Sequence, residues 1–219
     1  MSKRVEKSGP EGQLVSRNEV RAPRQSRSRA RVDAILQACK ELIVERGSAG
    51  LKVQDIAARA GVTAGSMYQY FPNKTAIIEA LARRYMEEFR GTLGSTVAEP
   101  VRDLDDCVAR LHQLLDQFFA FYECEPVFRD LLVSAAADKS LQDLDIEDSR
   151  FNAEQVFAFC RDLFPEKNWP ALHEFLFVCM HLASSAVQLA LSLPAERVSI
   201  IDNVKLLISR GALERFMSS

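Results

Sequence analysis

Apolar residues recur at steps of three and four positions along most of the chain, a spacing that predicts α-helices. In the first clear segment, one helical face would be formed by Val32, Ile35, Leu36, Cys39, Leu42 and Ile43. Gly47 and Gly50 should end that helix. Because no segment alternates convincingly between apolar and polar residues, we expect an all-α fold.

Two short helices should follow the first. The pattern predicts them at 53–60 and 64–71, joined at Gly61. Pro72 and Asn73 break the chain, after which a fourth helix should reach about residue 93. Further breaks, mostly at prolines, predict five more helices at about 101–124, 127–137, 139–164, 171–193 and 195–217.

The two short helices meet the requirements of a helix-turn-helix. On the second of them, Met67 and Phe71 lie one turn apart and can face inward. The outer face then carries small residues, which permit close approach to the major groove of DNA, and polar ones, which can bond phosphates or base edges. The candidate DNA-facing residues are Ala64, Gly65, Ser66, Tyr68 and Gln69, and Thr63 can cap this helix.

The segment 53–74, with Glu45-Arg46-Gly47 before it, resembles the TetR family of one-component regulators. The resemblance covers about residues 30–80. It implies a three-helix DNA-binding head that also has Thr63 on its DNA face, followed by a divergent helical body that dimerises and holds an effector pocket. Residues 125–150 are also similar to the C-terminal body of some family members.

The resemblance assigns roles to two lysines. Lys74, at the start of the fourth helix, is expected to grip a DNA phosphate. The family usually places Thr or Ser just before the second helix, whereas this chain has Leu51 and Lys52. Lys52 could replace the phosphate contact by its charge, but it cannot replace the hydroxyl cap.

The distribution of charge agrees with DNA binding at one end. Residues 1–74 contain 14 Lys and Arg against 7 Asp and Glu, whereas residues 75–219 contain 14 against 23. A basic end beside an acidic remainder suggests contact with a polyanion. We therefore divide the chain into a disordered basic arm at 1–27, a helix-turn-helix head at 28–74 and a helical effector-binding and dimerisation body at 75–219. The arm could either touch DNA or remain a solvated tail.

The predicted body is rich in aromatic residues that could line an effector pocket. Such residues at helical spacing often fill a core instead, so both interpretations stay open. Enclosure by aromatic side chains would suit a small, largely apolar effector with one polar or aromatic end. The candidate pocket residues are Phe118, Phe121, Tyr122, Trp169, Phe177 and His181.

The last two predicted helices are too apolar to bury their surface alone, so they should pack into the body or onto a partner. The family resemblance favours a homodimer through these helices. Small residues would let the helices approach closely, namely Ala183, Ser184, Ala186 and Ala190.

Other functions find less support. Five scattered cysteines without a CxxC pair argue for reduced thiols in the cytoplasm and against a metal site. A redox sensor would need an exposed cysteine of low pKa, and Cys39 should be buried while Cys124 stands between two glutamates. There is no phosphate loop, catalytic elbow or metal-binding helix, so we expect neither an enzyme nor a cofactor. No signal peptide and no uninterrupted apolar run of about 18 residues is present, so no membrane contact is expected.

The expected function is therefore a cytoplasmic transcriptional regulator. Two recognition helices in a twofold dimer would read a palindromic operator in double-stranded DNA. Repression with effector-driven release is the favoured direction, although an activator would use the same head.

Overall fold

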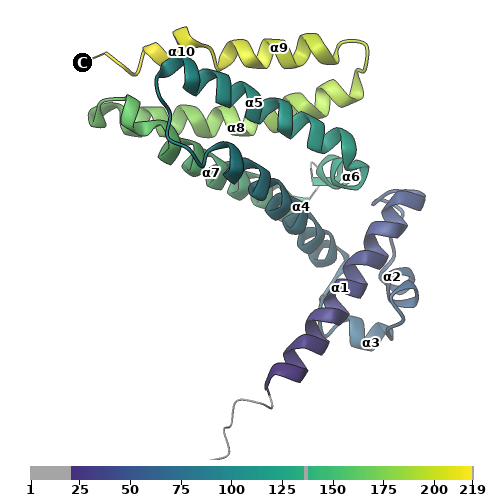
Figure 1. The fold of residues 1–219 in the computed structure, drawn as a ribbon. Coiled ribbons are helices and arrows are strands. Elements are labelled where there is room, and N and C mark those ends of the chain that lie inside the picture. The colour runs from purple at the N-terminus through teal and green to yellow at the C-terminus, as the bar shows by residue number, and fades with distance from the viewer. Residues whose placement is uncertain (1–20, 136–137, 219) are drawn as a thin grey trace, which may run out of the picture.

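The structure, a computed structural model, describes residues 21–135 and 138–218. The described residues are helical throughout, with no strand among them, which confirms the all-α prediction (Figure 1). Residues 1–20 of the predicted arm lie outside the described residues. The helices are α1 (Arg21–Arg46), α2 (Val53–Arg59), α3 (Ala64–Met67), α4 (Lys74–Thr96), α5 (Leu104–Cys124), α6 (Pro126–Ala135), α7 (Lys139–Cys160), α8 (Trp169–Ser192), α9 (Arg197–Leu207) and α10 (Arg210–Glu214).

Helices α1, α2 and α3 form the head, at one end of the molecule (Figure 1). Ile35, Ile56 and Met67 are fully buried between them. Gly47 and Gly61 adopt φ angles of +76° and +65°, which L-residues with side chains rarely adopt, and so allow the chain to reverse after α1 and α2.

Two boundaries in the head differ from the sequence prediction. Helix α1 begins at Arg21, so residues 21–27 of the predicted tail are helical. Helix α3 ends at Met67, and the chain passes through turns before Phe71. Phe71 nevertheless reaches the core, because both Tyr70 and Phe71 amides bond the Met67 carbonyl.

Helix α4 leaves the head and runs into the body, where it packs against α5, α6 and α7 (Figure 1). Helix α8 packs against α7 on one side and α9 on another. The head is also held to α6, since the Ser48 amide donates to Asp130 Oδ2 at 2.6 Å. Lys40 of α1 lies 3.4 Å from the Glu125 carboxylate, just before α6.

The single helix predicted at 195–217 is wrong, because the structure divides it into α9 and α10. The backbone leaves the helical conformation at Ile208, where ψ is 43°. Ser209 then caps α10 by accepting a hydrogen bond from the Ala212 amide. The break lets Ile208 and Leu213 both reach the core, where they are 2% and 1% exposed.

Trp169 begins α8 rather than breaking the chain before it. Pro170 occupies the second position of the helix, where a missing amide hydrogen costs little. The predicted helix 139–164 correspondingly ends earlier, at Cys160, and a 3-10 turn at Arg161–Leu163 follows it.

By length and composition alone, Glu166–Ser192 is long and apolar enough to cross a membrane, with a hydropathy of 1.7 in its most apolar window and 33% of that window buried. This corrects the expectation that no such segment exists. The expectation failed because isolated polar residues interrupt the apolar run without lowering its average much. Core helices can meet the same criterion, and α8 packs on α7, α9 and α5.

Candidate nucleic-acid interface and internal cavity

Helix α3 presents a small, capped N-terminus to solvent. The Thr63 side chain accepts a hydrogen bond from the Ser66 amide at 3.1 Å, so its hydroxyl hydrogen remains able to donate to an acceptor. A Cβ placed on Gly65 would meet no atom within 4 Å. Thr63, Ala64 and Gly65 are exposed, and this end of α3 therefore has room for close approach by another molecule.

The aromatic residues after α3 face in different directions. Met67 is fully buried and Phe71 is 7% exposed, whereas Tyr68 is 51% exposed. Gln69 is also exposed, and Tyr70 packs partly against the core. The Tyr68 hydroxyl and the Gln69 amide thus share an outer surface with the small residues of α3.

Basic side chains surround this surface. Lys52 precedes α2 and makes no cap hydrogen bond, as expected for a residue without a hydroxyl. Asn73 caps α4 by accepting from the Ala76 amide at 2.8 Å, which places Lys74 at the first helical position. The N-terminal part of α1 adds three exposed arginines, Arg27, Arg29 and Arg31.

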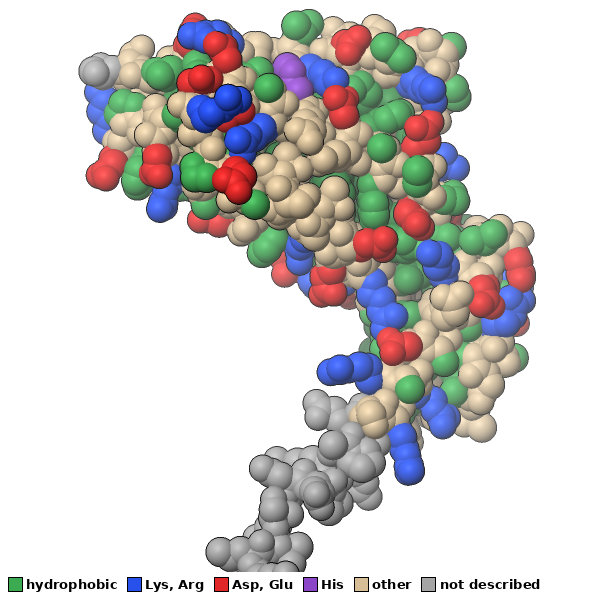
Figure 2. All heavy atoms as spheres, in the orientation of Figure 1, with side chains coloured by type: hydrophobic (Ala, Val, Ile, Leu, Met, Phe, Trp, Pro, Cys, Tyr) green, Lys and Arg blue, Asp and Glu red, His purple; other side chains and the backbone are tan. Residues whose placement is uncertain are grey.

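Figure 2 shows basic side chains projecting from this end of the molecule. Within the described part of the chain, none of the three arginines of α1 has a carboxylate partner, whereas Arg59 pairs with Glu45 at 2.8 Å and ties α2 to α1. Arg27, Arg29 and Arg31 are therefore available to an anion, and Arg59 has a structural role.

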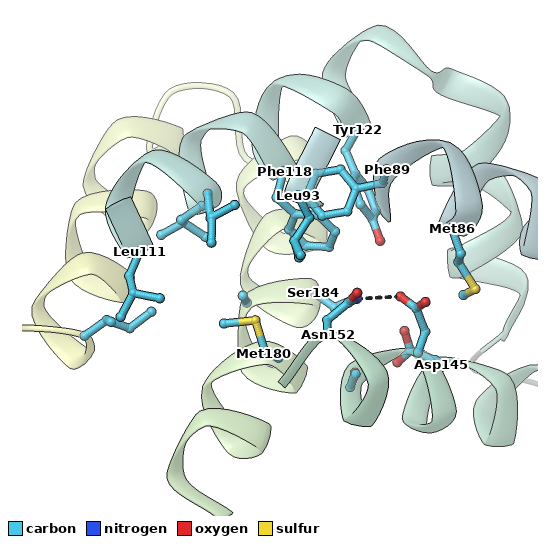
Figure 3. Close-up of a pocket in the computed structure, with 16 residues that line it drawn as sticks. Met86, Phe89, Leu93, Leu111, Phe118, Tyr122, Asp145, Asn152, Met180 and Ser184 are labelled. Atoms are coloured by element: carbon cyan, nitrogen blue, oxygen red, sulfur yellow. Dashed lines mark hydrogen bonds between the residues drawn. The ribbon is translucent and has the colours of Figure 1, made fainter. Parts of the chain in front are cut away.

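The body contains a partly enclosed cavity between α4, α5, α7 and α8, with a volume of about 40 Å³ (Figure 3). Most of its wall is apolar, formed by Met86, Phe89, Leu93, Leu111, Leu114, Leu115, Phe118, Met180, Ala183 and Ile208. The remaining wall is polar, formed by Tyr122, Asp145, Asp148, Ser149, Asn152 and Ser184. Drug-sized ligands occupy sites of about 300–1,000 Å³, so the cavity must open before it can hold one.

Two carboxyl groups of α7 dominate the polar wall. The Asp148 carboxylate lies 2.5 Å from the Arg90 guanidinium and accepts from Asn152 Nδ2 at 2.9 Å. Burial raises the pKa of Asp148 despite the opposing effect of Arg90. Burial likewise raises the pKa of Asp145, whose carboxylate lies 3.6 Å from His181 Nδ1.

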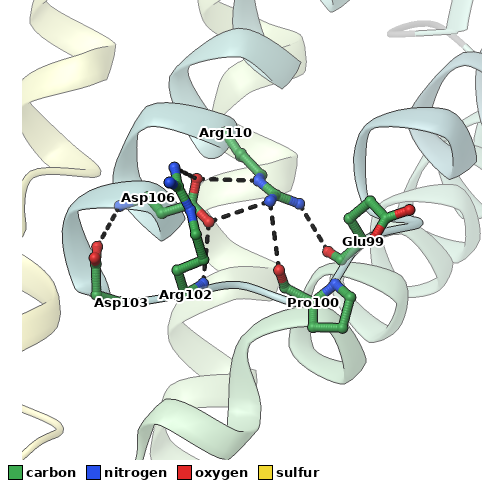
Figure 4. A network of polar contacts seen from close by, with 6 residues as sticks. All are labelled: Glu99, Pro100, Arg102, Asp103, Asp106 and Arg110. Carbon is green, nitrogen blue, oxygen red and sulfur yellow. Dashed lines mark hydrogen bonds and ion pairs between the residues drawn. The ribbon is translucent and has the colours of Figure 1, made fainter.

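A network at the start of α5 fixes the end of the cavity wall farther from the head (Figure 4). The Arg110 guanidinium donates to the Glu99 carbonyl at 2.7 Å and also pairs with Asp106. Hydrogen bonds from Arg102 hold the pKa of Asp106 at about 2, and Asp103 caps the helix. This network anchors the loop before α5, the helix that carries Leu111 and Phe118 into the cavity.

Two sequence profiles decide the family. Residues 35–81 match "Bacterial regulatory proteins, tetR family", and residues 105–216 match "Tetracyclin repressor-like, C-terminal domain". The chain belongs to the TetR family. It is thus a DNA-binding transcriptional regulator, from a family that is not enzymatic, and its helix-turn-helix is α2 and α3.

Among curated proteins, this TetR-family chain is similar to the transcriptional repressor DhaR of Mycobacterium sp. (strain GP1), with 34% identity over 35% of this chain and 40% of DhaR. It is also similar to the transcriptional activator FasR of Mycolicibacterium smegmatis, with 33% identity over 41% of this chain and 39% of FasR. The chain therefore spans less than half the length of these relatives.

Solved TetR-family structures share the fold over most of the chain. A TetR-family regulator from Streptomyces coelicolor is 27% identical, with a TM-score of 0.63 over 85% of this chain and 99% of that one. SmeT, the repressor of the Stenotrophomonas maltophilia multidrug efflux pump SmeDEF, is 21% identical, with a TM-score of 0.58 over 86% and 91% of the two chains. SmeT has also been solved in complex with triclosan.

The structure brings only two of the six candidate pocket residues, Phe118 and Tyr122, to the cavity wall. The other four candidates lie at helical positions that face away from the cavity. Phe121 packs against Tyr85, Phe89 and Phe128 instead.

The remaining three candidates lie at other surfaces of the body. Trp169 donates to the Arg161 and Phe164 carbonyls, both at 3.1 Å. Phe177 lies beneath the Arg150 guanidinium, and the His181 side chain, 40% exposed, reaches Asp145 from outside the cavity.

Sequence reasoning missed the polar wall of the cavity. Asp145, Asp148, Ser149 and Asn152 follow one another at helical spacing, so they form a polar stripe on α7. A polar stripe is usually the solvent face of a helix, so the stripe on α7 did not indicate a cavity wall. One signal could have revealed it. The opposite positions of α7 are not consistently apolar, so they do not form the buried face that a solvent-exposed polar stripe would require.

The surroundings of Cys39 do not support a redox-sensing role for this residue. The side chain is fully buried, and burial raises the pKa of its thiol to about 12. A redox-sensing cysteine needs a pKa shifted the other way.

The raised pKa of Asp145 predicts the effect of amidation. It means that the contribution of this group to stability is present below pH 3.8 and is lost as the pH rises through the raised value. Asp145→Asn should therefore raise the melting temperature at pH 7, and this gain should shrink as the pH falls towards 4. Asp148→Asn should raise it less, because the pKa of Asp148 is also raised but Arg90 loses its charged partner. Thermal melts of both variants between pH 4 and pH 7 test this assignment, and a folded Asp145→Asn that melts below the wild type at pH 7 would contradict it.

Proposed function

We propose that this regulator is a ligand-responsive repressor. It binds a palindromic operator as a homodimer in the cytoplasm and releases the DNA when a small, largely apolar effector enters the cavity. The observation that carries the proposal is the course of α4, which has Lys74 at its start beside the DNA-facing surface and Met86, Phe89 and Leu93 on the cavity wall.

The recognition surface supports the DNA part of the proposal. Ala64, Gly65 and Ser66 let α3 enter the major groove, where the Tyr68 hydroxyl and the Gln69 amide contact phosphates or base edges. Thr63, Lys52 and Lys74 contact phosphates at the rim. The arginines of α1 extend the contact along the DNA backbone.

The size of the cavity supports a mechanism for release. An effector larger than the cavity must displace part of its wall, and in this proposal the part that moves is α4. At 1.5 Å per residue, Lys74 lies about 18 Å along α4 from Met86. A tilt of α4 at the cavity would therefore displace its first residues, which belong to the head. An effector that fits the opened state better shifts the population towards it and weakens DNA binding.

The names of relatives support repression without deciding it. DhaR is a repressor and SmeT is a repressor that has been solved with a small molecule, whereas FasR is an activator. The head is compatible with either repression or activation. We adopt repression because an effector that enlarges the cavity would release the DNA.

The outer surfaces of α8 and α9 support dimerisation. One stripe of α8 is apolar yet exposed, at 45% for Val178, 47% for Leu182 and 51% for Leu189. Exposed apolar residues continue on α9 at Leu206 and Leu207. The opposite face of α8 packs on α7, so α8 is not apolar and exposed all round, as a helix surrounded by lipid would be. A single exposed apolar stripe suits contact with a second copy of the chain better.

The small residues of α8 do not have the role that the sequence suggested. Ala183, Ser184 and Ala190 are 5%, 4% and 0% exposed within a single chain, so they face its own core. Ala186 is half-buried against the same core. The larger exposed residues of the stripe, rather than these small ones, are the proposed dimer contacts.

Replacement of DNA-facing side chains should separate specific from general binding. The operator is first located by footprinting the DNA upstream of the gene. Tyr68→Ala should abolish specific operator binding while melting like the wild type, because the ring lies outside the core. Lys74→Ala should weaken binding to all sequences and lower the salt dependence by about one phosphate contact. Normal operator affinity for a folded Tyr68→Ala would show that this face is not the recognition surface.

A charge in the apolar stripe should give monomers. Leu189→Glu should shift the sedimentation coefficient to that of a monomer at micromolar concentration and reduce operator affinity, because the interface would bury an unpaired carboxylate. Val133→Glu, at a position on α6 that is 60% exposed, is the matched control and should remain dimeric. A wild-type protein that sediments as a monomer would refute the proposed assembly.

A further inference from the structure

The polar wall of the cavity carries an excess of negative charge. Arg90 pairs with Asp148 at 2.5 Å and so balances one of the two carboxyl groups. Asp145 has no Lys or Arg partner in the described part of the chain. His181 is the one basic side chain within 4 Å of it there, and it is partly exposed and absent from the cavity lining.

Two other polar atoms of this wall can still accept a hydrogen bond. Asn152 Oδ1 has no partner among the described residues, and its residue is only 7% exposed. Ser184 Oγ, on a residue that is 4% exposed, lies close to the Asp145 carboxylate; its one hydrogen can go to Asp145, which leaves its oxygen free to accept. Figure 3 shows both side chains at the cavity, on the side where Asp145 lies. A buried polar atom without a partner costs stability, and a ligand that supplies the missing bond removes this cost.

The chemistry of these atoms selects a donor. The Asp145 carboxylate and Asn152 Oδ1 only accept hydrogen bonds, and the Ser184 hydroxyl can accept one as well. An ammonium group carries three N–H donors and a positive charge, so it can satisfy all three. A carboxylate or phosphate ligand would instead meet the like charge of Asp145.

The opposite wall suits the rest of such a ligand. The rings of Phe89 and Phe118 lie 4.9 Å apart, and those of Phe118 and Tyr122 lie 4.6 Å apart. Aromatic faces attract a nearby cation and also bury a hydrocarbon body. Met86 and Met180, with their flexible side chains, lie at the walls that must move to enlarge the cavity.

We propose that the effector is a lipophilic amine. Its protonated amino group binds Asp145 between Asn152 Oδ1 and Ser184 Oγ, and its aryl or alkyl body lies among the rings and leucines of α4 and α5. This inference rests on the proposed function, because it assigns a chemical class to the effector of the same cavity.

A series of three probes that differ only in their end group tests the inference. The probes are 4-phenylbutylamine, 4-phenylbutanol and 4-phenylbutyrate, titrated calorimetrically into the full-length protein. The amine should bind at least about tenfold more tightly than the alcohol, as expected for charge-assisted hydrogen bonds, and the acid should bind most weakly. Equal affinity of amine and alcohol, or no binding of the amine, would overturn the inference.

Two variants assign the effect to the polar wall. Asp145→Asn should reduce amine affinity about tenfold or more and leave alcohol affinity unchanged. Asp143→Asn is the matched control, since Asp143 is an exposed residue of the same helix that pairs with Lys139, and it should bind the amine normally. Ser184→Ala provides a second variant and should also weaken binding of the amine selectively. Normal amine affinity in both Asp145→Asn and Ser184→Ala would refute the assignment.

A gel-shift assay on the same samples separates this inference from the proposed function. If the amine binds through Asp145 but leaves the operator complex intact, the amine site stands and effector-driven release is wrong. If the alcohol releases DNA as well as the amine does, release stands and the amine inference is wrong.

Discussion

The packing of α4 against both the head and the body is the constraint on which the rest of the structure depends. Its first residues are capped by Asn73 and belong to the core of the head, where Ile77 is fully buried. Its last turns, from Met86 to Leu93, close one side of the cavity. Helix α4 therefore contributes side chains to the cores of both the head and the body. Because both cores are closely packed, a displacement of α4 in one of them also displaces it in the other.

The polar wall makes the closed state a compromise. Among the described residues, a carboxyl group without a Lys or Arg partner and two polar atoms that can accept a further hydrogen bond lie beside leucine and phenylalanine side chains, at a cost that close packing of the apolar wall offsets. The Asp148–Arg90 pair joins α7 to α4 across this region, so the same charges that favour a cationic ligand also hold the helices together. A ligand that opens the cavity must replace those contacts with its own.

The burial pattern of the DNA-binding head could be predicted from the sequence, although the start of α1 and the end of α3 could not. Short helices with a glycine turn leave few alternatives, so Met67 and Phe71 were correctly expected inside and Tyr68 outside. The cavity could not be predicted in this way, because its wall combines single faces of four helices that are distant in sequence. Phe118 and Phe121 both pack on Phe89, but only Phe118 reaches the cavity wall, whereas Phe121 also contacts Phe128; that difference depends on how α5 packs on α4 and α6.

The central claim is that opening of the cavity weakens the grip on DNA through α4. It is tested most directly by the operator affinity of Ala183→Leu, which adds bulk to the cavity wall without changing the DNA-facing surface or the exposed stripe of α8. Ala171→Leu, at an exposed position of α8, is the control for added bulk. The account predicts that the folded Ala183→Leu dimer loses roughly 5- to 150-fold in operator affinity, the usual range of coupling between two sites. A folded, dimeric Ala183→Leu that binds the operator as tightly as Ala171→Leu would contradict it.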